Sequence, residues 1–403
     1  MEPAGSNPPV VTGRGSFVPA DVLTNEDVAA VVDPARLAAF VRANSWCRAR
    51  REALAPVASS VGTVAGTSAD AEAELDRRVY ARFVEERVGI RERRVVDRAA
   101  VLARRPSARA VMPSHLGAEA ARRALADAGV RADEIDVVVC GTSSPDALCP
   151  STAVRVQAIV GAASAWAFDL SAACSSFVFA LEAARGLVRS GSVRRALVVA
   201  AEWFTTNVDY ADPEAAYFFG DGAAAVVLES AELARGRRGF AVLDALCRSS
   251  ASDRITTALG GVRPYLARLH ADGAVGDAPA DAAYPWFHQD GPGVYRDVVP
   301  ATADLVRALL ARRGLAPEDV RRWFFHQASA VMVDGIASRL GVDGRDGARI
   351  ASTLDRYGNT SSAGVAMTLA EDATMEAGDL GCLVVFGGGY TLGATLLRRI
   401  GPA

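Results

Sequence analysis

The sequence predicts an α/β protein built from two copies of one folding unit. The segment AEAARRALADAGVRADEIDVVVCG (118–141) can be laid over ADLVRALLARRGLAPEDVRRWFFH (303–326) without a gap, at an offset of 185 residues. Short valine-rich runs alternate with amphipathic stretches, as in buried, mostly parallel strands covered by helices. With 403 residues, 50% of them apolar, the chain is long enough for two cores packed together.

The repeated elements follow one order. In each copy an amphipathic helix ends at a glycine, Gly129 or Gly314, an acidic turn follows, and a short apolar strand begins. The same offset carries the strand 195–201 onto 380–386 and Cys174 onto Asn359. A chance match of apolar patterns is the alternative, but the match survives through helix, turn and strand. We predict an N-terminal half at 1–232 and a C-terminal half at 233–403.

Two further helices are expected ahead of the first copy, in an insertion at approximately residues 35–80. ARLAAFVRANSWCRARREAL (35–54) and SADAEAELDRRVYARFVEER (68–87) both have amphipathic spacing. The stretch between them, PVASSVGTVAGTS (56–68), is rich in small residues and is predicted to be a flexible connection.

Cys174 is the candidate nucleophile. In AFDLSAACSSFVFALEAARGLV an apolar run passes through small residues into a helix, which places the thiol near a helix N-terminus. The helix dipole and free N–H groups there favour thiolate, so that a cysteine can react without a metal. The alternative is a small buried apolar side chain. The neighbouring alanines and serines favour function because they allow a substrate to approach closely.

His326 and Asn359 are the candidate polar partners of Cys174. His326 follows the apolar strand in RRWFFHQAS and precedes a helix, whereas His115, His270 and His288 lie in polar or Pro/Gly-containing contexts that predict loops. Asn359 lies in a turn before a helix, so a helix N-cap is the alternative. Its repeat equivalence to Cys174 predicts that the two side chains occupy matching places where strand ends of the halves meet.

Two glycine-rich segments complete the site candidates. FFGDGAAAVVLE (218–229) and FGGGYTLGATLL (386–397) each place glycines next to a strand. The three successive glycines of the second segment allow backbone N–H groups to turn toward a ligand, as an oxyanion hole requires. Neither segment has the spacing of a phosphate-binding loop.

Composition excludes several other classes of function. The formal net charge is −3 and the basic residues form no runs, which argues against nucleic acid. All 44 basic residues are arginine, so a lysine Schiff base and a Ser-x-x-Lys nucleophile are excluded. The six cysteines lack metal-ligand spacing, so no metal is expected. No apolar run approaches the roughly 18 residues of a membrane span, and no secretion signal is seen, so a soluble cytoplasmic protein is predicted.

These motifs together resemble the β-ketoacyl-acyl-carrier-protein synthase III family of thiolase-superfamily condensing enzymes. The similarity begins at VVTGRGSFVPADVLTNEDV and continues through GIRERRVV, DLSAACSSFVFAL, FGDGAAAVVLE, FFHQAS, TLDRYGNTSSA and FGGGYTLGATLLR. The resemblance implies a five-layer αβαβα thiolase fold, a homodimer and an acyltransferase of the EC 2.3.1 class. It implies no cofactor, because the substrates are acyl-CoA or acyl-carrier-protein thioesters.

The resemblance also implies a role for each matched residue. Cys174 would take an acyl group from a thioester, with the oxyanion held by the N–H groups of Cys174 and Gly388. His326 and Asn359 would stabilise the enolate that a malonyl-type thioester forms on losing carbon dioxide, and the enolate would then condense with the acyl group. The expected setting is polyketide or fatty-acid-like biosynthesis. The alternatives are acyl transfer to an oxygen, nitrogen or sulfur nucleophile without decarboxylation, and a catalytically silent partner protein.

Several positions bear on the substrate. The resemblance assigns Phe83 and Arg87 to the adenine of coenzyme A, and we add Phe386 to the substrate-binding residues. Cys149 stands where family members place a phenylalanine at the end of the partner's acyl pocket, which predicts a deeper or reshaped pocket. Ser329 and Val331 replace an asparagine and a basic residue near the carrier-binding entrance.

Two features have more than one interpretation. A hydroxymethylglutaryl synthase uses related chemistry on the same fold and needs a catalytic glutamate. Glu202 follows a strand and is a candidate, but a structural strand-end charge is the favoured interpretation. The 35–80 insertion is interpreted either as a surface helical hairpin that extends the dimer or as a lid beside the entrance to the site.

Overall fold

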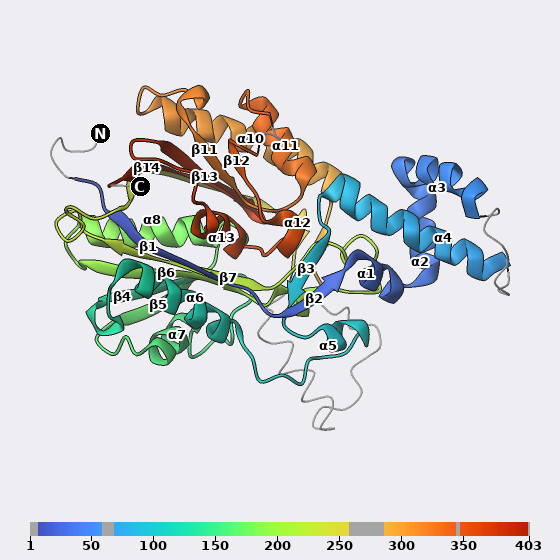
Figure 1. The fold of residues 1–403 in the computed structure, drawn as a ribbon, viewed down its shortest axis with the longest axis horizontal. Helices are drawn as coiled ribbons and strands as arrows, with labels where there is room; N and C mark the ends of the chain where they lie inside the picture. The colour runs from blue at the N-terminus through green and yellow to red at the C-terminus, as the bar shows by residue number, and fades with distance from the viewer. Residues whose placement is uncertain (1–6, 59–67, 258–285, 344–346, 402–403) are drawn as a thin grey trace.

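The computed structural model describes residues 7–58, 68–257, 286–343 and 347–401 (Figure 1). Its strands are β1 Val10–Phe17, β2 Asp21–Thr24, β3 Glu92–Val95, β4 Val137–Gly141, β5 Trp166–Leu170, β6 Arg195–Glu202, β7 Gly222–Glu229, β8 Gly239–Ser252, β9 Ile255–Thr256, β10 His288–Gln289, β11 Arg322–Phe325, β12 Ile350–Ala351, β13 Leu380–Gly387 and β14 Gly389–Ile400.

The α-helices are α1 Asn25–Val31, α2 Pro34–Ala43, α3 Ser45–Ala58, α4 Ser68–Phe83, α5 Arg98–Leu102, α6 Pro113–Ala128, α7 Thr152–Val160, α8 Ser176–Arg189, α10 Gly291–Ala311, α11 Ala330–Arg339, α12 Leu354–Tyr357 and α13 Ala363–Glu371. A π-helical turn, η1, covers Val84–Val88, and 3₁₀ turns cover Ala132–Glu134 (η2), Phe204–Asn207 (η3) and Pro317–Asp319 (η4).

A single sheet of ten strands runs through the described residues and joins the two halves. Its order is β12-β11-β13-β14-β8-β1-β7-β6-β4-β5. From its centre outward, the order β8-β14-β13-β11-β12 repeats the order β1-β7-β6-β4-β5 with the equivalent strands of the second copy. The halves meet where β1 pairs with β8 through Val10 opposite Ala241 and Val11 opposite Phe240.

The repeat predicted from the sequence is confirmed by the order of the strands and by two pairs of elements at the same offset. Strands β6 (195–202) and β13 (380–387) begin and end at the predicted offset. The two acidic turns, η2 and η4, do the same at 132–134 and 317–319. The predicted α/β class with two pseudo-symmetric halves is therefore correct.

The layers alternate as the five-layer αβαβα arrangement requires (Figure 1). Helices α10 and α11 lie on the outer face of the C-terminal strands, α6 and α7 lie on the outer face of the N-terminal strands, and α8 and α13 lie between them. Buried side chains from both halves share the central core, among them Phe177 and Val198 from the first and Leu383 and Ala366 from the second. This shared apolar interior fixes the strand ends of the halves against each other.

The insertion forms a projection at one end of the molecule (Figure 1). The predicted single helix over 35–54 is wrong, because α2 and α3 are separate helices that divide at Asn44. The backbone of Asn44 is extended, and its side-chain oxygen accepts from the Cys47 N–H at 3.1 Å, which begins a new helix. The predicted helix over 68–87 ends at Phe83 and continues as the π-helical turn η1.

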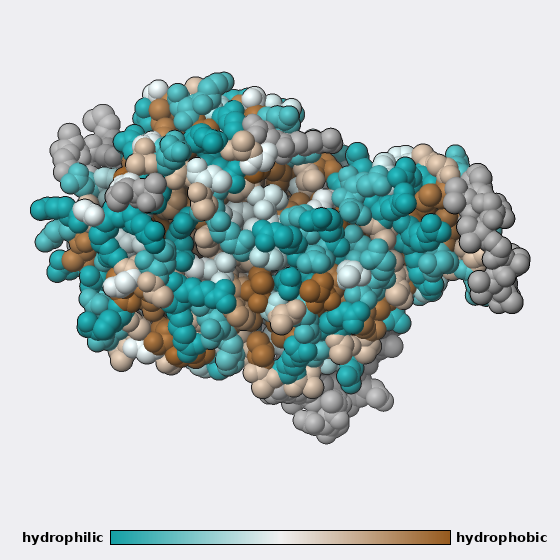
Figure 2. All heavy atoms as spheres, in the orientation of Figure 1, coloured by the Kyte–Doolittle hydropathy of each residue, from teal (hydrophilic) through white to brown (hydrophobic). Residues whose placement is uncertain are grey.

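Helices α2, α3 and α4 of the insertion enclose an apolar interior together with adjacent segments of the main fold. Leu37, Val41, Cys47 and Val79 are buried in it. The outer surface of the projection is mostly hydrophilic in the view of Figure 2. Residues 56–58 of the predicted connection belong to α3, Ser68 begins α4, and 59–67 lie outside the described residues. Among the helices that the structure describes, none is long and apolar enough to cross a membrane.

Candidate active site

Cys174 lies between β5 and the start of α8, as predicted. The residue before it, Ala173, has a φ of 50°, and its repeat equivalent before Asn359, Gly358, has a φ of 66°. Both halves therefore reverse the chain with a positive φ just before the candidate residue. The Ser361 hydroxyl donates to the sulfur of Cys174 at 3.6 Å.

Cys174 is not the thiolate that its place near a helix N-terminus suggested. Burial raises the pKa of the Cys174 thiol to about 11, with the carboxyl of Glu202 contributing, while the bond from Ser361 opposes the shift. Desolvation outweighs the stabilising groups, so the resting side chain is a thiol at neutral pH.

His326 stands at the carboxyl end of β11, and its side chain is 2% exposed. Burial lowers the pKa of His326 to about 3, with a hydrogen bond to the Ser361 backbone opposing the shift, so the imidazole is neutral at pH 7. Its Nδ1 has no hydrogen-bond partner among the residues that the structure describes. A buried nitrogen without a protein partner is available to form a hydrogen bond with a ligand.

The other histidines lie away from the site. The loop predicted around His115 is wrong, because this residue is in the first turn of α6, where its Nδ1 accepts from the Met112 N–H. His288 is in β10 rather than in a loop. His270 lies outside the described residues.

Asn359 lies between α12 and α13 and is 6% exposed. Its N–H donates to the Phe218 carbonyl at 2.9 Å, and its own carbonyl accepts from the Gly220 N–H at 3.1 Å. The helix-cap alternative is wrong, because α13 begins at Ala363, four residues after Asn359, with Ser362 as its N-cap residue. The Asn359 side-chain oxygen instead accepts from the Ser361 N–H at 2.9 Å, which leaves the amide NH₂ for a ligand.

These three side chains line one cavity of about 330 Å³. Its walls are largely aromatic and include Tyr217, Phe218, Phe219, Phe287, Tyr295 and Phe386. The ring of Phe386 meets His326 edge to face at 5.1 Å between centroids, which helps to keep the imidazole desolvated. Ser329 caps α11 and lines the cavity together with Val331, which is 40% exposed.

Four other predicted site residues do not line this cavity. Phe83 packs in an aromatic cluster of the insertion, Arg87 is exposed on η1, and Cys149 is exposed on the loop before α7. Gly388 is buried beside the cavity wall, where its carbonyl accepts from the Thr391 hydroxyl at 3.2 Å. The structure therefore brings Cys174, His326, Asn359 and Phe386 together at one place.

Two residues at the centre of the site, Gly387 and Ser361, were not predicted individually, although the glycine run that contains Gly387 was. Gly387 lines the cavity, and a Cβ there would lie 2.8 Å from the backbone nitrogen of Cys174, so only glycine fits. Ser361 contacts all three candidate residues. The sequence feature that could have indicated Ser361 is the run of hydroxyl residues after Asn359, but helix N-capping explained that run equally well.

Glu202 lies at the end of β6, and its side chain is fully buried. Its carboxyl accepts from the Ser143 N–H and from the hydroxyls of Ser144 and Ser362. Burial raises the pKa of Glu202, and these donors oppose the shift. Since they tie the loop after β4 to the start of α13, the favoured interpretation as a structural residue agrees with the geometry.

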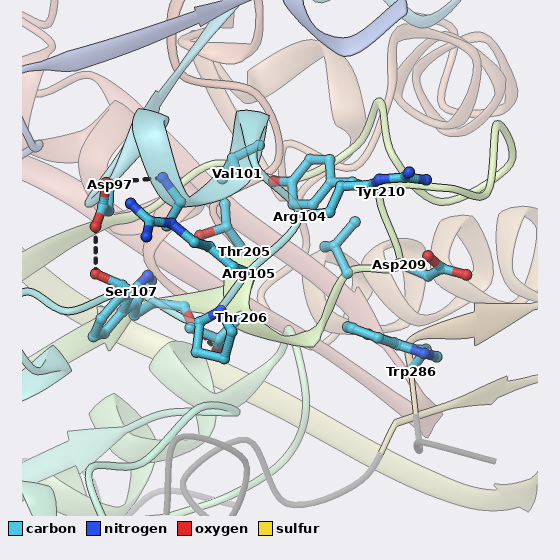
Figure 3. A pocket seen from close by; sticks show the side chains of 14 residues that line it. Asp97, Val101, Arg104, Arg105, Ser107, Thr205, Thr206, Asp209, Tyr210 and Trp286 are labelled. Atoms are coloured by element: carbon cyan, nitrogen blue, oxygen red, sulfur yellow. Dashed lines mark hydrogen bonds between the residues drawn. The ribbon is translucent and has the colours of Figure 1, made fainter. Parts of the chain in front are cut away.

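A second cavity of about 330 Å³ lies beside α5 and η3 (Figure 3). Arg104, Arg105, Trp203, Tyr210 and Trp286 are among the residues that line it. Cys174, His326 and Asn359 do not, so we do not assign the reaction to this cavity.

The thiols of the chain are unpaired, and the described residues contain no cluster suited to a metal ion. All six cysteines are free. Within residues 7–58, 68–257, 286–343 and 347–401, no three His, Cys, Asp or Glu side chains are grouped to hold one.

Comparison with known proteins agrees with the fold. The family models of 3-oxoacyl-[acyl-carrier-protein] synthase III match residues 168–250 and, for the C-terminal part, 310–399. The β-ketoacyl-[acyl-carrier-protein] synthase III of Rhodospirillum centenum is 31% identical over 392 residues, which cover 96% of this chain and 98% of the relative.

Solved structures match over nearly the whole chain. The synthase III of Pseudomonas aeruginosa is 28% identical with a TM-score of 0.71, covering 98% of this chain and 99% of that one. The priming β-ketosynthase of the R1128 polyketide biosynthetic pathway is 25% identical with a TM-score of 0.72, covering 100% and 99%.

The fold and the site define a condensing enzyme of the thiolase class. Within that class, the chain belongs to the β-ketoacyl-acyl-carrier-protein synthase III family. Members of this family are acyltransferases.

Proposed function

We propose that this enzyme transfers an acyl group from a thioester to Cys174 and condenses it with a malonyl-type thioester, with loss of carbon dioxide. The observation that carries the proposal is the convergence of Cys174, His326 and Asn359 on one largely aromatic cavity. The names of the relatives, a β-ketoacyl-[acyl-carrier-protein] synthase III and the priming β-ketosynthase of a polyketide pathway, support this chemistry. The proposed setting is fatty-acid or polyketide synthesis.

In the first half-reaction, the sulfur of Cys174 attacks the acyl thioester carbonyl. The carrier thiol leaves and takes up the proton that Cys174 gives up, so no proton is consumed overall. The Cys174 N–H and the backbone of the neighbouring glycine pair Gly387-Gly388 supply the proposed oxyanion site. A single donor of this kind is worth roughly 3 kcal/mol in the transition state.

In the second half-reaction, the malonyl carboxylate leaves as carbon dioxide and its electron pair forms an enolate. The neutral imidazole of His326 and the amide NH₂ of Asn359 donate to the enolate oxygen. The enolate carbon then attacks the acyl carbonyl, and the sulfur of Cys174 leaves and takes up one proton. Neutral donors suit this step, because they stabilise the developing charge without protonating the carbanion.

Thioesters of coenzyme A or of an acyl carrier protein are the proposed substrates, in a homodimer. The proposed contact between protomers is the edge strand β5, which pairs only with β4 among the described strands. Trp166 on this edge is 50% exposed and Leu148 nearby in sequence is 73% exposed. Large apolar side chains at an open strand edge favour a second copy.

Intact-protein mass spectrometry with acyl-CoAs, followed by a malonyl thioester and carbon dioxide detection, tests the proposal. We expect an adduct on Cys174 that is absent in Cys174→Ala. It should be discharged with carbon dioxide release only while Asn359 is present, as Asn359→Ala will show. Discharge by an alcohol, amine or thiol alone would make the protein a simple acyltransferase, and no adduct at all would leave a silent partner protein.

A further inference from the structure

The helices of the insertion contact one segment of the main fold, residues 209–220, which we call the wall segment. The Asp33 N–H before α2 donates to the Ala211 carbonyl at 3.1 Å. Arg36 of α2 pairs with Asp209 at 3.2 Å. The hydroxyl of Tyr80, a fully buried residue of α4, donates to the Pro213 carbonyl at 2.8 Å.

Aromatic rings extend this contact toward the cavity. Tyr80 and Phe83 of α4 both meet the ring of Tyr217 near to edge-on, at 6.2 and 5.9 Å between centroids. Phe40 of α2 packs against the same two rings at 5.6 and 5.4 Å. Tyr217 in turn contacts Phe218 at 4.1 Å. A continuous set of packed rings thus runs from the insertion to the wall segment.

The other side of the wall segment forms part of the candidate site. Tyr217, Phe218 and Phe219 line the cavity. The two backbone hydrogen bonds of Asn359 are made with Phe218 and Gly220 of the same segment. The wall segment therefore carries both an aromatic side of the cavity and the main-chain support of Asn359.

One further anchor holds the wall segment from the interior. The fully buried guanidinium of Arg93 donates to the Tyr217 carbonyl at 2.8 Å and to the Asn25 side chain at 2.9 Å. Arg93 fixes the main chain at Tyr217, whereas the insertion is what restrains the ring of Tyr217 and the stretch around Pro213.

We propose that the insertion is a positioning element, which holds the wall segment through Tyr80 and Phe83 and so sets the place of Asn359. This inference rests on the proposed function, in which Asn359 acts only in the decarboxylating half-reaction. Loss of the support should slow that step and leave acylation of Cys174 unchanged. A displacement of about 1 Å at a reacting group can cost roughly 100-fold in rate.

Three single variants test the inference. Tyr80→Leu removes the ring contact and the hydrogen bond to Pro213, whereas Tyr80→Phe keeps the ring. Arg78→Ala is the matched control on the same helix, because Arg78 is exposed and makes no ion pair or hydrogen bond within the described residues. Phe83→Leu removes the second ring contact. It also replaces Tyr80→Leu as the test if that variant does not accumulate as folded protein.

The two half-reactions are measured separately with acyl- and malonyl-pantetheine thioesters. These lack the adenine nucleotide, so a contact between Phe83 and coenzyme A cannot affect the result. Intact mass gives the acylation rate and the number of acylated sites, and single-turnover carbon dioxide release per acylated site gives the second rate.

We expect Tyr80→Leu and Phe83→Leu to keep the acylation rate within about twofold and to lose about tenfold or more in carbon dioxide release. Tyr80→Phe should recover most of the loss, and Arg78→Ala should match the wild type. Equal losses in both half-reactions, or no loss in either, would overturn the positioning role. Failure of the wild type to become acylated would instead overturn the proposed function.

Discussion

The hydroxyl of Ser361 donates to the sulfur of Cys174, and the residue is fully buried with a φ of 48°. A donor to sulfur stabilises the thiolate, so Ser361→Ala should raise the already high pKa of Cys174 further. A lost hydrogen bond of about 1.4 kcal/mol corresponds to about one pKa unit and a tenfold lower thiolate fraction at neutral pH. Rates of iodoacetamide alkylation between pH 7 and 10 measure this shift.

The control for Ser361→Ala is Ser190→Ala, which removes an exposed hydroxyl far along α8 from the site. Alkylation of that variant should follow the wild-type pH dependence. An unchanged profile in Ser361→Ala would mean that this hydroxyl does not set the reactivity of Cys174.

His326 should make the stability of the protein depend on pH. Its folded-state pKa of about 3 lies below the ordinary value of 6.5, so between these values the unfolded chain binds a proton that the folded chain does not. The free energy of unfolding should therefore fall as pH decreases from 6.5 toward 3, by up to about 1.4 kcal/mol per pH unit from this group. The contribution is fully present above pH 6.5.

Urea unfolding of the wild type and His326→Gln at pH 7.5, 6 and 5 checks this. Any stability advantage of the wild type over the variant should shrink as pH falls. Asp221 acts in the opposite direction, because burial raises its pKa to about 7, but it is present in both proteins and cancels in the difference. A difference that stays constant over this range would contradict the low pKa of His326.

At the scale of elements, the exposed edge strand β5 carries a prediction about assembly. Trp166→Arg places a charge on the open edge and should weaken pairing with a second copy without loosening the core. We expect the wild type to be a dimer and the variant to shift toward monomer in light scattering at micromolar concentration. Arg155→Ala on the neighbouring helix α7 is the control. A monomeric wild type would exclude the proposed contact.

Elements with a clear pattern in their own stretch of sequence could be predicted, whereas features that depend on distant contacts could not. The helices, acidic turns and strands of the two copies repeat at one offset in the sequence, so the prediction for one copy supported the prediction for the other. The break at Asn44 could not be read in advance, because the apolar spacing of 35–54 continues across it and one side-chain hydrogen bond decides it. The packing of Phe83 against Tyr217 joins residues distant in sequence, and no local sequence pattern predicts such a contact.

The candidate site was predictable in its chemistry and less so in its surroundings. Cys174, His326 and Asn359 were found because each follows or precedes a recognisable element. The cavity wall and Ser361 depend on how the halves pack, which sequence spacing does not describe. The protonation of Cys174 also depends on that packing, since burial outweighs its place near a helix N-terminus.

At the scale of the whole molecule, the continuous sheet and shared core predict that neither half is stable alone. We propose the boundary at 232/233, in the connection between β7 and β8. Residues 1–232 expressed alone should aggregate, because they expose Phe177, Val198 and the β1 edge that β8 covers. Coexpression with 233–403 should recover soluble protein that forms the Cys174 adduct. A folded, monomeric 1–232 fragment would contradict the prediction.

The matching places of Cys174 and Asn359 have a consequence for how such an enzyme could arise. A symmetric pair of identical half-length chains would present the same side chain at both places, two thiols or two amides. The single chain removes this constraint, because its two copies can carry different residues, here a nucleophile and an enolate donor. The positive φ before both residues shows that the two places share one backbone turn although their side chains differ chemically.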